Sequence, residues 1–438
     1  MNTKRPSRAR RPDPAATLAE AGRLAALQRL DEAERLLARH PGEPECVFQR
    51  GAVLTTLQRW AEAETCFRRT LVKAPSHFDS AVGLAGALIE QGRPAEALPW
   101  LDAAIAAQPE SGRLRYFRGV ALEEAGRLAE GVVELAAARA MLIAPAERRR
   151  LVPWEVYVQV SRRCNLRCAM CGHGIWQSNS GFMDQAVFDR VLTECRANGI
   201  GKLNILAGQG EPLLHPRIFA MLDQAVAAGL EVHIVTNGTP LTPERAERLG
   251  RLGLASIQFS FAGWDKESYE RVYAGARFEQ VLANLLALHA ATRGTRTEFF
   301  VKAVVADDAW AEVSRRTRAF LAEHGIDKVF AVAANNFGGT VQCGRYHPRW
   351  GVWSLKPLDH QRRLPCRVTL NAVGVFCDGT VTACGCYDAN AELKIGHILE
   401  QGLAEIRRGP AFRRILEAFR SGDVSTLPLC RGCDDAFG

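Results

Sequence analysis

Long apolar runs are absent from this sequence. None approaches the roughly 18–20 residues that a membrane-spanning helix needs, so we expect no membrane association. The basic N-terminus, MNTKRPSRARRPDP, also lacks the apolar stretch of a secretory signal, which favours a cytoplasmic protein. Its five basic residues and Asp13 give this tail a net charge of +4, half of the protein's +8. We therefore expect a disordered tail over residues 1–15 and no nucleic-acid partner for the nearly neutral remainder.

Cysteine is scarce in the first part of the chain and abundant later. Of 13 cysteines, only Cys46 and Cys66 precede residue 150. Disulfides are rare in a reducing compartment, where clustered cysteines more often hold metal or carry out redox chemistry. A chain of 438 residues is too long for one ordinary core, and two or three domains are expected. The cysteines therefore predict metal chemistry in the later domains.

Residues 16–145 contain an internal repeat. The segments RWAEAETCF, RPAEALPWL and RLAEGVVEL place the small residues Ala63, Ala97 and Gly131 at intervals of 34. This period resembles the tetratricopeptide repeat, which implies an all-α solenoid of paired helices. Such an arm either binds a protein or peptide on its concave surface or serves in packing or dimerisation. The residues expected between the paired helices are Leu54, Leu88 and Leu122.

The pattern changes after a segment, 145–154, that we interpret as a linker. Short apolar strands then alternate with amphipathic helices, which predicts a parallel sheet, open or curled into a partial barrel. Chemistry in such sheets gathers at the carboxyl ends of the strands. The expected strands are Val156–Val160, Lys202–Leu206, Glu231–Val235, Ser256–Phe261, Glu298–Val305 and Lys328–Val332; the expected helices are Asp184–Ala197, Arg217–Ala228, Pro243–Leu252, Phe278–His289 and Trp310–His324.

Three cysteines follow the first expected strand directly. Cys164, Cys168 and Cys171 give three thiolates on one tight loop, enough for three irons of a 4Fe–4S cube. The fourth iron is then open to a reactant. The alternative is a zinc knuckle, which needs a fourth ligand such as His173.

The second expected strand is followed by Gly210-Glu211-Pro212, and the third by Asn237-Gly238. Together with the three cysteines, these segments resemble the radical S-adenosylmethionine (SAM) superfamily. The resemblance implies a partial (β/α)6 barrel over residues 152–340, with SAM chelating the open iron. Glu211 would accept the SAM ammonium, and Ser260 would lie near its ribose or carboxylate unless it merely caps backbone. Relatives often have Asp at the position of Ala262, so the resemblance implies that this chain lacks a polar contact there. The implied cofactor-binding residues are Gly208, Gly210, Glu211, Pro212, Asn237 and Ser260.

A second cysteine group lies in residues 341–438, for which we expect a small α+β domain. A hairpin turning at Asp378-Gly379 would bring two cysteines together, and a distant C-x2-C would complete four ligands. This resembles the short "twitch" form of the SPASM extension and implies one auxiliary 4Fe–4S cluster, because the chain stops at Gly438. A tetrahedral zinc site is the alternative. The expected ligands are Cys366, Cys384, Cys430 and Cys433; Cys386 is an alternative ligand, and Cys343, Cys377 and Cys386 are candidate hydrogen-atom donors or ordinary thiols.

The resemblance implies an enzyme with two 4Fe–4S clusters. An electron from a donor such as flavodoxin or ferredoxin would cleave SAM to methionine and a 5′-deoxyadenosyl radical, which abstracts hydrogen from substrate. The expected substrate is a peptide or protein, and the repeat domain is a candidate site for a protein partner. The alternatives are an oxidase or epimerase of a sugar or cyclitol, and a non-catalytic scaffold that binds zinc.

Overall fold

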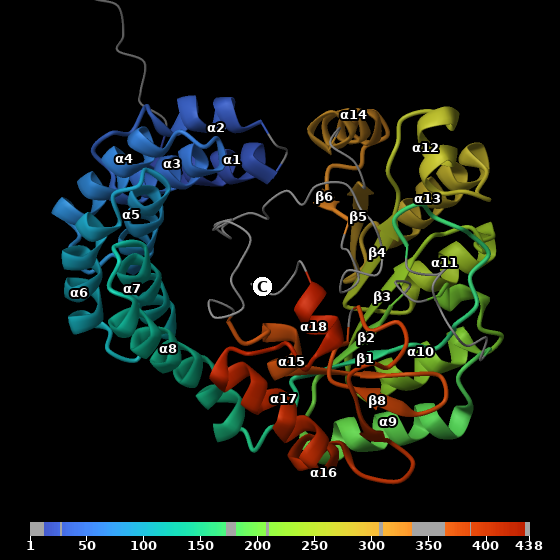
Figure 1. The fold of residues 1–438 in the computed structure, drawn as a ribbon. Helices are drawn as coiled ribbons and strands as arrows, with labels where there is room; N and C mark the ends of the chain where they lie inside the picture. The colour runs from blue at the N-terminus through green and yellow to red at the C-terminus, as the bar shows by residue number, and fades with distance from the viewer. Residues whose placement is uncertain are drawn as a thin grey trace, which may run out of the picture. The chain divides into compact units, whose positions relative to one another are not determined.

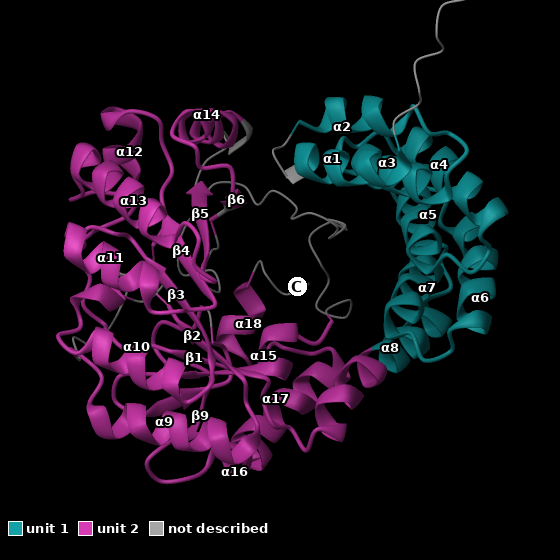
Figure 2. Ribbon diagram, turned by 180° about the vertical axis from the view of Figure 1, so that it is seen from behind, with its two compact units in different colours: residues 1–138 teal, residues 139–438 magenta. Residues whose placement is uncertain are grey.

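The computed structural model describes residues 13–26, 29–171, 181–206, 210–305, 310–334, 364–385 and 387–433. The chain forms two compact units, Met1–Ala138 and Arg139–Gly438 (Figure 2). Among the described helices, none is both long enough and apolar enough to cross a membrane. Most of the tail expected to be disordered lies outside the described residues, and the first helix begins at Pro14.

The first unit is built of consecutive helices that pack against their neighbours in the chain (Figure 1). Small residues allow this close approach, because a Cβ at Gly51 would lie 2.7 Å from the ring of Phe67. Leu54, Leu88 and Leu122 are fully buried, as predicted. The predicted helical repeat is therefore confirmed. Its elements are α1 (Pro14–Ala26), α2 (Leu30–Leu37), α3 (Pro44–Thr56), α4 (Trp60–Lys73), α5 (Phe78–Glu90), η1 (Pro94–Ala97), α6 (Leu98–Ala107), α7 (Gly112–Glu124) and the start of α8 (Leu128–Arg148).

The prediction of a linker over residues 145–154 is wrong for its first residues. Helix α8 continues through Pro145 to Arg148. A proline removes one helical hydrogen bond, but Ile143 and Ala146 beside it are buried in the core of the second unit, which holds the helix together. The chain leaves the helix only at Arg150 and Leu151, both in the left-handed conformation.

The second unit contains the predicted parallel sheet. Six strands pair in chain order, and all five pairings between them are parallel. Alternate residues face opposite sides: Val156 and Val158 are fully buried, whereas Tyr157 between them is half-buried. The strands are β1 (Glu155–Val158), β2 (Lys202–Ile205), β3 (Glu231–Thr236), β4 (Ser256–Ser260), β5 (Glu298–Val305) and β6 (Val329–Ala333).

Helices between the strands occupy the positions that the sequence predicts, within a few residues at either end. Helix α12 was not predicted, and its seven residues begin at a capping box formed by Asp265 and Ser268. The elements are α9 (Gln185–Asn198), η3 (Pro212–Leu214), α10 (Ile218–Ala227), α11 (Pro243–Arg251), α12 (Lys266–Val272), α13 (Phe278–Thr292) and α14 (Trp310–Glu323).

The C-terminal region adds three strands to the same sheet. Strand β7 pairs in parallel with β1, and the predicted hairpin follows, with Gly379 in its turn at φ +90°. The hairpin therefore covers the β1 edge, which would otherwise expose unpaired backbone groups. The elements are α15 (Arg367–Asn371), β7 (Ala372–Val375), β8 (Thr380–Thr382), β9 (Lys394–His397), α16 (Leu403–Arg408), α17 (Pro410–Ser421) and α18 (Pro428–Gly432).

Candidate functional site

The three-cysteine loop begins six residues after the end of β1, at the carboxyl edge of the sheet. The turn that contains Gly210 packs against the start of this loop. A Cβ at Gly210 would lie 2.0 Å from the carbonyl oxygen of Ser161, and its φ of +146° also favours glycine. The backbone N–H of Glu211 donates to the carbonyl oxygen of Arg163 at 2.9 Å. The two segments that resemblance assigns to one site are thus in direct contact.

The thiols of this loop are partly buried and act on one another. Burial, together with the neighbouring Glu211 and Cys171 charges, raises the pKa of Cys164 to about 11. Burial also raises the pKa of Cys168, again with contributions from Cys171 and Cys164. Three thiolates at this position therefore need a positive group among them, which iron supplies. The loop fits a metal cluster in its chemistry and in its charge.

Asn237, which follows β3, contacts the first cysteine directly. Its side-chain Nδ2 lies 3.7 Å from the Sγ of Cys164. The amide is oriented by Thr239, whose backbone N and Oγ1 donate to the Asn237 Oδ1 at 2.9 and 2.6 Å. The N–H side is thereby turned toward the sulfur.

Glu211 lies in the interior and is fully shielded from solvent. Its carboxylate accepts hydrogen bonds from Leu213 N at 3.0 Å, Thr236 Oγ1 at 2.7 Å and Asn237 N at 2.7 Å. Burial raises its pKa to about 7 despite these donors. Glu211 therefore joins the turn after β2 to the turn after β3. Its expected contact with the SAM ammonium stays a prediction.

The remaining expected cofactor-binding residues have simpler positions. Pro212 is buried at the start of η3, and Gly208 lies outside the described residues. Ser260 ends β4 half-buried, and Lys302 on β5 is its register partner. Sequence reasoning missed Lys302, although it alternates with buried residues along β5 and so could have been placed on the same face.

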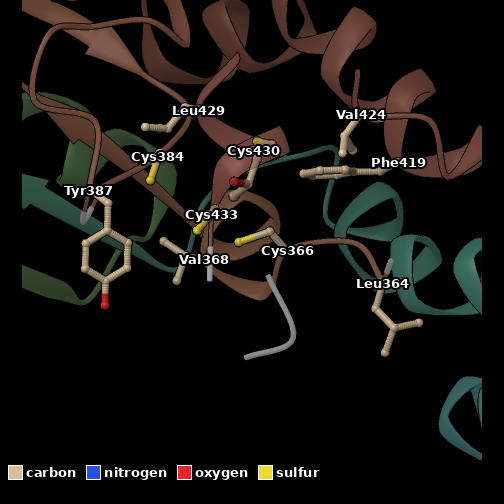
Figure 3. A pocket seen from close by; sticks show the side chains of 11 residues that line it. Leu364, Cys366, Val368, Cys384, Tyr387, Phe419, Val424, Leu429, Cys430 and Cys433 are labelled. Atoms are coloured by element: carbon tan, nitrogen blue, oxygen red, sulfur yellow. The ribbon is translucent and has the colours of Figure 1, made fainter. Parts of the chain in front are cut away.

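The four predicted auxiliary ligands line one pocket (Figure 3). They come from the start of α15, the end of β8, and α18 with the residue after it. Figure 3 shows the four cysteine side chains around this pocket, with apolar side chains such as Phe419 and Leu429 also lining it. These ligands are Cys366, Cys384, Cys430 and Cys433.

By donor type, the four thiols of this pocket suit both of the predicted groups, an iron–sulfur cluster and a tetrahedral zinc ion. A zinc ion takes its sulfur ligands at about 2.3 Å from one point, whereas a 4Fe–4S cube takes one thiolate at each separate iron.

A fully buried arginine supports this pocket. The Arg407 guanidinium donates to the carbonyl oxygens of Thr369 and Leu370 at 2.7 Å and of Ala372 at 2.9 Å. These are the carbonyls at the end of α15, the helix that begins after Cys366. Arg407 therefore satisfies the helix terminus behind a ligand. Sequence reasoning missed it, because no local pattern marks a buried arginine.

Of the other cysteines of the C-terminal region, the described one, Cys377, does not line this pocket. Cys377 is buried, its Sγ donates to the carbonyl oxygen of Gln159 at 3.0 Å, and burial raises its pKa to about 12. It is therefore an unreactive thiol in this conformation. Cys343 and Cys386, and the alternative zinc ligand His173, lie outside the described residues.

Three families of known proteins match separate parts of the chain. The Radical SAM superfamily matches residues 158–302, and the SPASM iron–sulfur cluster-binding domain matches residues 366–434. The tetratricopeptide repeat matches residues 48–111 and 101–141. The chain thus carries all three predicted modules in the predicted order.

Individual relatives are similar over shorter stretches. The tungsten-containing aldehyde ferredoxin oxidoreductase cofactor-modifying protein of Pyrococcus furiosus is 36% identical over 105 residues, which are 24% of this chain and 30% of that protein. The mycofactocin maturase MftC of Mycobacterium tuberculosis is 27% identical over 225 residues, 50% of this chain and 53% of its own. The chain therefore spans about a third to a half of the curated relatives it matches.

A solved structure has the same fold. Streptococcus suis SuiB bound to precursor peptide SuiA superposes with a TM-score of 0.51 at 15% identity, covering 74% of this chain and 88% of that one.

Proposed function

Because the chain contains a radical SAM domain followed by a SPASM domain, we propose that it is a radical SAM enzyme that modifies a peptide or protein. The observation that carries the proposal is the contact of Asn237 and Gly210 with the three-cysteine loop, on the sheet that also carries the four-cysteine pocket.

The catalytic cluster would be held by Cys164, Cys168 and Cys171. When bound with SAM, this group supplies one-electron cleavage of the sulfonium and a radical able to abstract hydrogen. The chain's own residues hold and shield it. Asn237 donates toward one sulfur, Glu211 fixes the turns on either side, and the Gly210 backbone borders the loop without a side chain.

A peptide or protein substrate is supported by the similarity to maturases. MftC is named as a maturase, and other relatives at 28–30% identity are named PqqA peptide cyclases. Tetratricopeptide repeats commonly present a concave surface to a peptide or protein partner. In this proposal the repeats bind a part of the substrate that is not itself modified.

The first test is cofactor content and SAM cleavage. Protein purified and reconstituted without oxygen should be brown, contain about eight irons if both cubes form, and release 5′-deoxyadenosine with SAM and dithionite. Colourless protein with stoichiometric zinc and no cleavage would establish the scaffold alternative.

The second test concerns the substrate. Short peptides encoded beside the gene should change in mass when incubated with the enzyme and SAM. Sugars and cyclitols, offered in the same assay with deuterium at carbon, should transfer none to 5′-deoxyadenosine. Transfer from a sugar without any peptide product would replace the peptide with a small molecule.

A further inference from the structure

Two tyrosine hydroxyls are buried beside the three-cysteine loop without a partner. Tyr269 lies within α12 and Tyr273 follows it directly; the exposed fractions of these residues are 0% and 1%. Their rings stack on each other with centroids 4.7 Å apart. Neither hydroxyl has a hydrogen-bond partner among the residues that the structure describes. Most buried hydroxyls in proteins are bonded, so this pair calls for an acceptor.

The backbone fixes these tyrosines against the loop. The N–H of Arg167 donates to the carbonyl oxygen of Ala274 at 2.9 Å, and that of Ala169 donates to Val272 at 3.0 Å. The two bonds bracket Cys168 on one segment and Tyr273 on the other. Two hydrogen bonds therefore hold the middle cysteine opposite Tyr273, on whose ring Tyr269 stacks.

Electrostatics agrees with this placement. Burial raises the pKa of both phenols, and the charge of a Cys168 thiolate raises it further. Both hydroxyls therefore keep their protons and can act as hydrogen-bond donors. An anionic cluster beside two protonated hydroxyls that lack a partner would supply the acceptor for their hydrogen bonds.

We propose that Tyr269 and Tyr273 donate hydrogen bonds to the sulfur atoms of the cluster held by Cys168, and so raise its reduction potential. The inference rests on the proposed function, because it requires the iron–sulfur cluster there. Hydrogen bonds to cluster sulfurs stabilise the more negative, reduced state. The two tyrosines are positioning residues that act on the cluster through these bonds.

The test uses Tyr269→Phe, Tyr273→Phe and the double variant in the full chain. Phenylalanine keeps the ring packing and removes only the hydroxyl. Tyr116→Phe, a buried tyrosine in the first unit, is the matched control. The midpoint potential of the SAM-free catalytic cluster is measured by redox titration followed by electron paramagnetic resonance. We expect a more negative potential in each single variant, a larger shift in the double variant, and no shift in the control.

A second measurement separates a bond to the cluster from a change in packing. Thermal unfolding is compared with and without the cluster. Without it, the Phe variants should be as stable as the parent or more stable, because an unpaired hydroxyl has been removed. With it, they should be less stable than the parent. Loss of an exchangeable-proton coupling to the cluster in the variants would support the same conclusion.

The outcomes distinguish this inference from the proposed function. Unchanged potentials in all variants, in protein that binds the cluster and cleaves SAM, overturn only the role of the tyrosines. Equal destabilisation with and without the cluster would also overturn it, since the hydroxyls would then serve the fold alone. Failure of the parent protein to bind a cluster would overturn both.

Discussion

Asn237 Nδ2 lies 3.7 Å from Cys164 Sγ, so the turn after β3 is attached to the loop after β1 through a cluster ligand. Thr239 holds the amide in this orientation by donating twice to its oxygen. Thr239 therefore stabilises the contact between the amide and the sulfur. Loss of such a contact to a metal ligand typically lowers metal affinity or activity by about 10–100-fold.

Asn237→Asp should therefore weaken the catalytic site while leaving the fold intact. Aspartate keeps the size of the side chain but places a negative charge, without an N–H, beside Cys164. We expect the rate of 5′-deoxyadenosine release to fall by about tenfold or more, with a lower reduction potential of the cluster. Gln108→Glu, an exposed amide-to-carboxylate change in the first unit, is the control and should have the parent rate. An unchanged rate in Asn237→Asp would mean that the amide does not act on the sulfur.

Substitutions in the two cysteine groups should have different effects on SAM cleavage and product formation. Cys168→Ala should abolish SAM cleavage, because it removes one of three ligands to the catalytic cluster. Cys430→Ala should leave SAM cleavage uncoupled from product formation and lower the iron content by about four atoms. Cys195→Ala, at a fully buried thiol on α9, should keep the iron of both clusters. Release of 5′-deoxyadenosine by Cys168→Ala would contradict the assignment of the loop.

Patterns local in sequence predicted much of this molecule. The period of 34 predicted the helical repeat, and short apolar segments alternating with amphipathic helices predicted β1 to β6 in order. The turn at Asp378-Gly379 predicted the hairpin that carries Cys384. Each of these signals lies within one short segment or recurs at a fixed interval, which is why a single sequence sufficed.

Contacts between distant segments could not be predicted in the same way. The pairing of β7 with β1 joins residues more than 200 positions apart, and no turn chemistry specifies it. Burial of Ile143 and Ala146 in the second unit overrode the helix-breaking tendency of Pro145. Glu211 lies in a recognisable motif, but its hydrogen-bond donors Thr236 and Asn237 lie at the end of the third strand. Tertiary burial decided all three cases.

Arg407→Met tests the support behind the auxiliary pocket. Methionine has a similar length but leaves three carbonyl oxygens at the end of α15 without their donor. Each buried carbonyl left without its donor is expected to cost about 1–3 kcal/mol of unfolding free energy, and removal of the buried charge offsets part of this cost. Iron content should fall toward that of a single cluster. Arg408→Met, whose side chain is exposed on the same helix, should change neither quantity.

Glu211 should make stability depend on pH. Its folded pKa of about 7 lies above the value of 4.5 expected in the unfolded chain. The contribution of Glu211 to the free energy of unfolding is therefore fully present below about pH 4.5 and is lost as pH rises through 7. At 1.36 kcal/mol per pKa unit, the total is about 3 kcal/mol.

The measurement compares the parent with Glu211→Gln by denaturant unfolding of cluster-free protein. The stability of the parent relative to the variant should decrease from about pH 5 to about pH 8, because only the parent must bury a charge. Glu247→Gln, at an exposed position on α11, should show a constant difference. A constant difference for Glu211→Gln would show that its carboxyl ionises normally.

A matched pair of glycines tests the close approach at the candidate active site. A Cβ at Gly210 would lie 2.0 Å from the Ser161 carbonyl oxygen, whereas a Cβ at Gly201 would meet nothing within 4 Å. Because backbone cannot move aside as a flexible side chain can, Gly210→Ala should lower the unfolding free energy by about 1–3 kcal/mol or more. The displaced turn should also weaken SAM binding, measured by equilibrium dialysis with the reconstituted protein. Gly201→Ala should match the parent in both assays, and equal behaviour of the two variants would show that the turn is not held against the loop.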